Sequence, residues 1–256
     1  MTKINISIAG ALGRMGKILI KRINDNKNLK LCSLTDVNTG KFLQNIKVQS
    51  NSLGAFDHAD VIIDFSRPEG SLKVIDLAIK LKKNVVIGTT GFTEMQNKII
   101  LKASKKIAIF KSGNMSLGIN VLEYISEIIA KKMPNNYQVS ITDNHHKKKI
   151  DYPSGTALML ASAVAKGKGK KIMSLIGKSS FNKKIKPNNK INFFITRKGS
   201  TIGKHSVEFN NKIERIELKH DAFTRELFAD GAINAAIWIR KKKSGFFNMK
   251  DMLNLK

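Results

Sequence analysis

The chain has 256 residues, enough to form one or two domains with a hydrophobic core. Hydrophobic residues make up 42% and charged residues 25%, which is close to globular averages and excludes wholesale disorder. No apolar run approaches the roughly 18 residues of a membrane span. The single cysteine, Cys32, excludes an intrachain disulfide framework and favours a reducing compartment. We therefore expect a cytoplasmic protein that has no membrane partner.

The net charge of +27, from 46 Lys and Arg residues against 19 Asp and Glu residues, raises the alternative of a nucleic-acid-binding protein. Only seven of the basic residues are arginines, whereas proteins that bind phosphates and DNA grooves favour the bidentate arginine side chain. The lysines are scattered in short runs such as Lys82-Lys83 and Lys131-Lys132. This pattern favours a solvated basic surface without a dedicated nucleic-acid partner.

In the first half of the chain, predicted strands alternate with predicted helices. Ile4, Ile6 and Ile8 alternate with polar residues, which is typical of a strand. Pro68 is placed to begin a helix, and Ser66 is its predicted N-cap. The alternation predicts an α/β domain with a Rossmann-type, doubly wound parallel sheet. The predicted strands are 3–9, 29–34, 61–65, 84–87 and 107–110, and the predicted helices are 13–24, 68–81 and 94–104.

The second half predicts a different domain. The segment 166–190 is rich in Gly, Lys, Ser and Asn and predicts a long loop. The strands that follow have no helices between them, so we expect antiparallel neighbours in the open, mixed or antiparallel sheet of an α+β domain. The predicted strands are 138–142, 191–196, 206–209 and 212–218, and the predicted helices are 117–131, 154–165 and 223–240, the last packing back on the first domain. The apolar stripe predicted for helix 117–131 consists of Leu117, Val121, Leu122, Ile125, Ile128 and Ile129.

A glycine-rich turn joins the first strand to the first helix. Gly10, Gly13 and Gly16 would let a pyrophosphate approach the backbone at the N-terminus of the helix, although Leu12 stands where the usual dinucleotide fingerprint has a glycine. Asp36 lies 20 residues after Gly16, at the spacing of the acidic residue that binds a ribose 2′-hydroxyl. These residues predict a dinucleotide site, with an ordinary turn and a solvated Asp as the alternative.

Two further loops follow predicted strands, at Gly88-Thr89-Thr90-Gly91 and at Ser112-Gly113-Asn114-Met115. In open α/β sheets, ligands bind beyond the carboxyl ends of the strands. The small and hydroxylated residues of both loops would let the nicotinamide half of a cofactor lie close to the backbone. Plain turns are the alternative.

A cationic cluster precedes the helix predicted over 154–165. His145 and His146 are followed by Lys147, Lys148 and Lys149, which together supply a group titrating near neutrality and fixed positive charge. The start of that helix, Ser154-Gly155-Thr156, offers hydroxyls and backbone N–H groups for a carboxylate. This segment predicts a site that binds a small dianion and delivers a proton, with a basic surface loop as the alternative. The zinc ligands expected for a metal site are missing, so no metal is expected.

Six segments, in this order along nearly the whole chain, resemble the dihydrodipicolinate reductase family, also called 4-hydroxy-tetrahydrodipicolinate reductases. The segment containing His145, His146 and Pro153-Ser154-Gly155-Thr156 is the most specific to the family. The matching segments are 10–16 (GALGRMG), 64–70 (DFSRPEG), 86–92 (VIGTTGF), 114–121 (NMSLGINV), 144–157 (NHHKKKIDYPSGTA) and 225–238 (RELFADGAINAAIW).

The resemblance implies a reductase of lysine and diaminopimelate biosynthesis. It would pass a hydride from NADH or NADPH to a cyclic dicarboxylate, and the chain would form a homotetramer through its open sheet. A dinucleotide-binding domain would comprise 1–115 and 226–256, and a substrate-binding and oligomerisation domain 116–225. His145 would be the acid/base residue, Lys149 the proton donor, and His146, Ser154, Gly155 and Thr156 the substrate-binding residues. The cofactor would be bound by Gly10, Ala11, Leu12, Gly13, Arg14, Met15, Asp36, Gly88, Thr89, Thr90, Ser112, Gly113, Asn114 and Met115.

Asp36 is followed by Val37, whereas relatives that use NADPH well often have a basic residue there to meet the 2′-phosphate. We therefore expect a preference for NADH, which Lys41 or the general positive field could soften. Three alternatives to the family's activity are another two-domain nicotinamide dehydrogenase of a small dicarboxylate, a basic nucleic-acid-binding protein on a vestigial nucleotide fold, and an inert regulatory relative.

Overall fold

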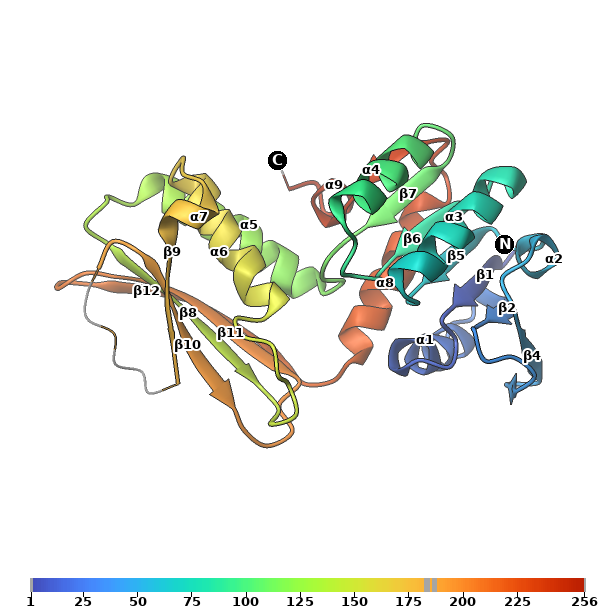
Figure 1. Ribbon diagram of the computed structural model, residues 1–256, viewed down its shortest axis with the longest axis horizontal. Coiled ribbons are helices and arrows are strands. Elements are labelled where there is room, and N and C mark those ends of the chain that lie inside the picture. The colour runs from blue at the N-terminus through green and yellow to red at the C-terminus, as the bar shows by residue number, and fades with distance from the viewer. Residues whose placement is uncertain (1, 182–184, 186–187, 256) are drawn as a thin grey trace. The chain divides into compact units, whose positions relative to one another are not determined.

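The computed structural model describes residues 2–181, 185 and 188–255, which divide into two compact units (Figure 1). Unit 1 comprises Met1–Ser116 and Arg225–Lys256, and unit 2 comprises Leu117–Thr224. Each unit is built around its own sheet. Within the described part of the chain, no helix is long and apolar enough to cross a membrane.

Unit 1 contains an eight-stranded sheet in the order β13-β7-β6-β5-β1-β2-β4-β3, parallel except for the β3–β4 pair. Every residue of β5 and β6 is buried because helices cover both faces, which explains their continuous apolar sequence. The strands are β1 (Ile4–Ala9), β2 (Leu29–Thr35), β3 (Phe42–Leu43), β4 (Ile46–Gln49), β5 (Val61–Asp64), β6 (Asn84–Ile87), β7 (Ala108–Lys111) and β13 (Gly245–Phe247).

The helices of unit 1 form two groups. Helix α1 packs against α8, and α3 packs against α2 and α4. Figure 1 shows α3 and α4 on one face of the sheet and α8 on the other, as in a doubly wound fold. The helices are α1 (Arg14–Asn24), α2 (Leu53–Phe56), α3 (Pro68–Leu81), α4 (Glu94–Ala103), α8 (Glu226–Ile239) and α9 (Met249–Met252).

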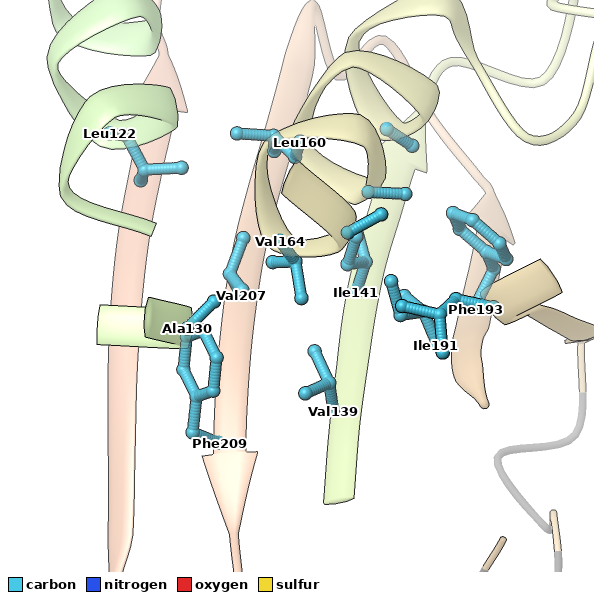
Figure 2. Packing of buried hydrophobic residues seen from close by; sticks show 14 of the residues in the cluster. Leu122, Ala130, Val139, Ile141, Leu160, Val164, Ile191, Phe193, Val207 and Phe209 are labelled. Carbon is cyan, nitrogen blue, oxygen red and sulfur yellow. The ribbon is translucent and has the colours of Figure 1, made fainter. Parts of the chain in front are cut away.

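Unit 2 contains a five-stranded mixed sheet in the order β12-β11-β8-β10-β9, with α5 and α6 packed on one face (Figure 1). Its core, seen in Figure 2, joins Leu160 and Val164 of α6 to aliphatic and aromatic residues of β8, β10 and β11. The elements are α5 (Leu117–Lys132), β8 (Gln138–His145), α6 (Gly155–Gly167), α7 (Ile172–Leu175), β9 (Ile176–Ser180), β10 (Ile191–Arg197), β11 (Gly203–Asn210) and β12 (Arg215–Ala222).

These sheets confirm the expected fold class, but the strand pairing of unit 2 was predicted wrongly in part. β10 does not pair with β11 as a hairpin, because β8 lies between them, parallel to β10 and antiparallel to β11. The segment 166–190 is not one long loop, since it contains α7 and β9, and β9 pairs with β10. Residues 182–184 and 186–187 of that segment lie outside the described residues.

One local prediction was also wrong, and a second was wrong in part. Arg67, not Ser66, is the N-cap of α3, because the Ser66 hydroxyl donates a hydrogen bond to Asp64 at 2.6 Å. The stripe predicted for α5 is its buried face only in part: Leu122 is buried and Ile129 packs against the core of unit 2, but Val121, Ile125 and Ile128 are exposed. The buried residues of α5 are Ile119, Asn120, Leu122, Ser126 and Ala130.

The core of unit 2 generates a stability prediction. Phe209→Ala removes a fully buried ring between β11 and the helices, and should lower the free energy of unfolding by about 3–5 kcal/mol. Phe223→Ala is the matched control, because this ring is 85% exposed and its loss should change stability by less than about 0.5 kcal/mol. Urea unfolding followed by circular dichroism measures both variants. Equal losses would contradict the placement of Phe209.

Candidate active site

The cofactor residues predicted from the sequence all lie at one edge of the unit 1 sheet. They follow the carboxyl ends of four parallel strands, β1, β2, β6 and β7. The sheet order reverses direction at β1, with β2 on one side and β5 on the other, and this switch point is where open α/β sheets bind ligands. The structure therefore brings together residues as distant in sequence as Gly10 and Ser112 along one edge.

The glycine turn after β1 requires glycine for steric reasons. Gly10 has φ +80°, and a Cβ there would lie 2.5 Å from the carbonyl oxygen of Phe65. A Cβ on Gly16 would lie 2.3 Å from the carbonyl oxygen of Gly10, so both glycines permit close backbone packing. Gly13 is the exposed N-cap of α1, and no side chain caps the helix. The uncapped N–H groups at this end suit an anionic phosphate.

Asp36 reaches back from the end of β2 to this turn. Its carboxylate accepts hydrogen bonds from the backbone N–H groups of Leu12 at 3.0 Å and Asn38 at 3.3 Å. These contacts hold an acidic group beside the glycine turn. Val37, the next residue, is 92% exposed and offers no charge at that position.

Arg225 is a residue of this region that the motif analysis did not single out for a role. It is the N-cap of α8, and burial together with the positive charge of Arg14 lowers its pKa. Arg14 is the first residue of α1, next to the glycine turn. Two guanidinium groups that repel each other at this turn would be stabilised by a bound anion.

The loops after β5 and β6 are joined by a buried carboxylate, Asp64. It accepts hydrogen bonds from the hydroxyls of Ser66, Ser71 and Thr89, of which the Thr89 bond measures 3.1 Å. Burial raises the pKa of Asp64. Thr89 is 6% exposed and its hydroxyl is bonded to Asp64. This loop would therefore contact a ligand through its backbone groups and not through the Thr89 side chain. Gly88 has the Phe65 ring packed against it, and Thr90 is exposed.

The loop after β7 is held by its own side chains. The Ser112 hydroxyl donates to the carbonyl oxygen of Asn114 at 2.7 Å, and the Asn114 side chain accepts from the backbone N–H of Ser116 at 2.9 Å. Gly113 is exposed, whereas Met115 is only 3% exposed. Met115 therefore belongs to the packed interior of unit 1 in this structure, with little of its thioether side chain available as a cofactor wall.

In unit 2, the alternation of β8 places two polar residues on its buried face. Val139 and Ile141 face the core, and Asp143 and His145 continue the same face toward the end of the strand. The strand register sets His205 opposite Asp143 and Arg197 opposite His145. A cluster of two histidines, one carboxylate and one guanidinium thus forms at the carboxyl end of β8, and sequence reasoning identified only His145.

Asp143 is fully buried and is the centre of this cluster. Its Oδ1 lies 2.8 Å from Nδ1 of His145 and 3.4 Å from Nε2 of His205, while its Oδ2 lies 3.0 Å from Nη2 of Arg197. Oδ2 also accepts the backbone N–H of Ser154 at 2.7 Å. Burial alone would raise the pKa of Asp143, but these four contacts outweigh it and hold the pKa well below its usual range.

His145 is 8% exposed, and its two ring nitrogens have different surroundings. Nδ1 faces Asp143, whereas Nε2 lies 3.3 Å from where a Cβ on Gly203 would be. Burial lowers the pKa of the neighbouring His205, which favours its neutral form. With Nδ1 facing a carboxylate, Nε2 is the nitrogen of His145 that can exchange a proton.

Asp143, His145 and His205 can present ligand atoms within 4.8 Å of one another, a spacing that a metal ion could bridge. Two ligand atoms at 2.0–2.2 Å from a tetrahedral zinc ion are roughly 3.3–3.6 Å apart. The 2.8 Å between His145 and Asp143 is shorter and suits direct bonding of the two side chains. Arg197 on the same carboxylate would also repel a cation.

The remaining predicted residues lie around this cluster. Nζ of Lys149 is 2.8 and 2.7 Å from the two carboxylate oxygens of Asp151; burial raises the pKa of Asp151, but the lysine outweighs it and lowers the pKa. Ser154 caps α6 by accepting the backbone N–H of Ala157. At Gly155, an added Cβ would meet no atom within 4 Å, so the start of α6 borders open space. His146 and Thr156 are partly buried.

The two buried carboxylates predict opposite effects of pH on stability. The pKa of Asp143 is depressed, so its stabilisation is present above the unfolded value of about 4 and is lost as the pH falls below it. The pKa of Asp64 is raised, so its stabilisation is present below about pH 4 and is lost as the pH rises through the folded value.

Asp143→Asn should therefore lower the free energy of unfolding by about 3–5 kcal/mol at pH 7, because it leaves the buried Arg197 guanidinium without its carboxylate, and the difference from the unmodified protein should shrink toward pH 3. Asp64→Asn should show the reverse trend, with its largest relative loss at low pH. Urea unfolding across this range measures both. Parallel pH curves for the two variants would contradict the assignment.

Two family models match consecutive parts of the chain. Residues 4–115 match the family dihydrodipicolinate reductase, N-terminus, and residues 118–253 match dihydrodipicolinate reductase, C-terminus. The 4-hydroxy-tetrahydrodipicolinate reductase of Pelagibacter ubique (strain HTCC1062) is 48% identical over 258 residues, with 100% of both chains covered. That of Buchnera aphidicola subsp. Cinara cedri (strain Cc) is 43% identical over 98% of this chain and 97% of its own.

A solved structure supports the fold. Dipicolinate-bound dihydrodipicolinate reductase from Paenisporosarcina sp. TG-14 has a TM-score of 0.79 at 22% identity, covering 96% of this chain and 98% of that one. An engineered D-amino acid dehydrogenase bound to NADP⁺ has a TM-score of 0.58 at 12% identity, covering 97% of this chain and 93% of that one. The two family matches together span nearly the whole chain, which therefore belongs to the dihydrodipicolinate reductase family.

Proposed function

We propose that this protein reduces 4-hydroxy-tetrahydrodipicolinate to tetrahydrodipicolinate with NAD(P)H, in lysine and diaminopimelate biosynthesis. The observation that carries the proposal is a buried histidine oriented by a carboxylate, beside a helix start that can bind carboxylates, in a chain of this family. The reaction consumes one hydride and one proton, and the substrate's hydroxyl leaves as water. The alternatives of a nucleic-acid-binding protein and of an inert relative have no comparable support in the structure.

The edge of the unit 1 sheet fits a nicotinamide dinucleotide, which supplies the hydride when it is bound. The positive φ of Gly10 and the uncapped α1 N-terminus fit a pyrophosphate. Asp36 would accept hydrogen bonds from a ribose and repel a 2′-phosphate, which supports a preference for NADH. The other residues proposed to bind the cofactor are Ala11, Leu12, Gly13, Arg14, Met15, Gly88, Thr89, Thr90, Ser112, Gly113, Asn114 and Met115.

Unit 2 would bind the substrate and move the proton. His146 and the Ser154-Gly155-Thr156 turn would bind the two carboxylates of the ring, with N–H donors and hydroxyls at the start of α6. His145 would exchange a proton through Nε2, and Lys149, now paired with Asp151, would be the proton donor once the dianion competes for it. These groups need no metal.

The assembly and location are also proposed. β8 side chains such as Ser140 and Thr142 alternate away from the face covered by α5 and α6, and they are only half-buried in the isolated chain. Pairing of such sheet faces between copies would support a homotetramer. A small-molecule biosynthetic reductase with one cysteine fits a cytoplasmic location without a membrane partner or a dedicated nucleic-acid partner.

The activity and the cofactor preference are tested together. NADH and NADPH oxidation by the purified protein should be followed with substrate generated in situ by the preceding condensing enzyme. We expect turnover with both, and a higher kcat/KM with NADH because Asp36 is followed by the uncharged Val37. A higher value with NADPH would overturn the cofactor argument, and no turnover by folded protein that binds dinucleotide would overturn the function.

Variants of the proposed acid/base residues separate chemistry from binding. His145→Gln should lower kcat by about 10²-fold or more with the fold intact, because the proton transfer loses its carrier. Lys149→Ala should lower kcat and raise the KM for substrate, whereas Lys147→Ala, an exposed neighbour, is the control and should change kcat far less. Full turnover by His145→Gln would refute the role of His145. An effect of Lys149→Ala on cofactor affinity alone would refute the role of Lys149.

A further inference from the structure

One buried carboxylate connects four elements of unit 2. Asp143 lies on β8, and its partners are His145 at the end of the same strand, Arg197 on β10, His205 on β11 and Ser154 at the start of α6. The two oxygens are divided between these partners. Oδ1 faces both histidines, and Oδ2 faces the guanidinium and the backbone N–H of Ser154.

Burying an ionised carboxylate at this position costs free energy, so its presence there needs an explanation. Val139 and Ile141 occupy the preceding positions on the same face of β8, so packing alone would favour an aliphatic residue at position 143. Burial of a carboxylate with a guanidinium is frequently no more stable than an apolar pair of similar volume. The cluster is therefore better explained by what the carboxylate does to its neighbours than by stability.

We propose that Asp143 is a positioning residue that places both parts of the substrate site, the proton-exchanging nitrogen of His145 and the carboxylate-binding start of α6. This inference rests on the function proposed above. Nδ1 of His145 lies 2.8 Å from Oδ1 of Asp143, which favours the proton on Nδ1 and leaves the lone pair on Nε2 to take or give the proton. Asp143 remains ionised throughout, so within this cluster the only proton that moves is the one on Nε2 of His145.

The same carboxylate fixes the turn that would bind the substrate. Oδ2 holds the N–H of Ser154, the N-cap of α6, whose hydroxyl in turn accepts the N–H of Ala157. Gly155 and Thr156 follow directly. A change at Asp143 should therefore alter kcat through His145 and the KM for substrate through this turn, while the nucleotide residues of unit 1 are untouched.

His205 holds the carboxylate from the opposite side and should have the opposite tautomer. Its Nε2 lies 3.4 Å from Oδ1 of Asp143 and 3.3 Å from the Ser154 hydroxyl. Within the described residues, its buried Nδ1 has no hydrogen-bond partner. An unpaired ring N–H is costlier there than an unpaired lone pair, so the proton of His205 belongs on Nε2. Arg197 secures the other oxygen.

The test combines kinetics with long-range ¹⁵N NMR of the histidine side chains. In the unmodified protein, neutral His145 should show the Nδ1–H tautomer and His205 the Nε2–H tautomer. Asp143→Asn should lower kcat by roughly 10²-fold or more, raise the KM for substrate, give mixed tautomers of His145, and leave the dissociation constant of NADH within about twofold. Ile141→Val, which trims the adjacent position on the same face, is the control and should keep both tautomers and kcat.

Three results would overturn the proposal: an Nε2–H tautomer of His145 in the unmodified protein, an unchanged kcat in folded Asp143→Asn, or a weakening of NADH binding equal to the loss in kcat. The tautomers of the unmodified protein decide the question if Asp143→Asn does not fold. They also separate this proposal from the function, because an inactive protein with the expected tautomers would refute the substrate assignment and leave the positioning role standing.

Discussion

The arrangement of unit 2 depends on the buried carboxylate of Asp143. A lone ionised carboxylate in this environment would be too costly to keep, and it persists because its partners are brought to it by strand register and a helix start. Arg197 and His205 come from strands on either side of β8, so the cluster forms only when β8, β10 and β11 have paired.

Unit 1 uses a second buried carboxylate with different partners. Asp64 accepts hydrogen bonds from three hydroxyls, and burial dominates, so its pKa rises, whereas the pKa of Asp143, which faces a guanidinium and two histidines, falls. Both carboxylates stand at or near carboxyl ends of strands, and each joins segments that are far apart in sequence. The different partners, hydroxyls for Asp64 and charged groups for Asp143, account for the opposite pKa shifts.

The glycine turn and the His145 segment were predictable because their chemistry is local. Gly10 needs a positive φ, and Ser154 caps the helix that it precedes, so both signals lie within a few residues. Arg197 and His205 gave no local signal, since each joins Asp143 only through the pairing of β8 with β10 and β11. Asp143 itself could have been found from the alternation of β8, which puts it on the same face as His145.

The sequence by itself determined the alternating strands and helices of unit 1, the nucleotide turn and the family, because periodicity, glycine placement and motifs depend on near neighbours. Tertiary structure alone decided that β8 lies between β10 and β11, which face of α5 is buried, and that Ser66 bonds Asp64 instead of capping α3. Each of these outcomes depends on which strand or side chain, distant in the sequence, makes the more favourable contact. Sheet order and buried hydrogen bonds are properties of the assembled unit, and no local pattern contains them.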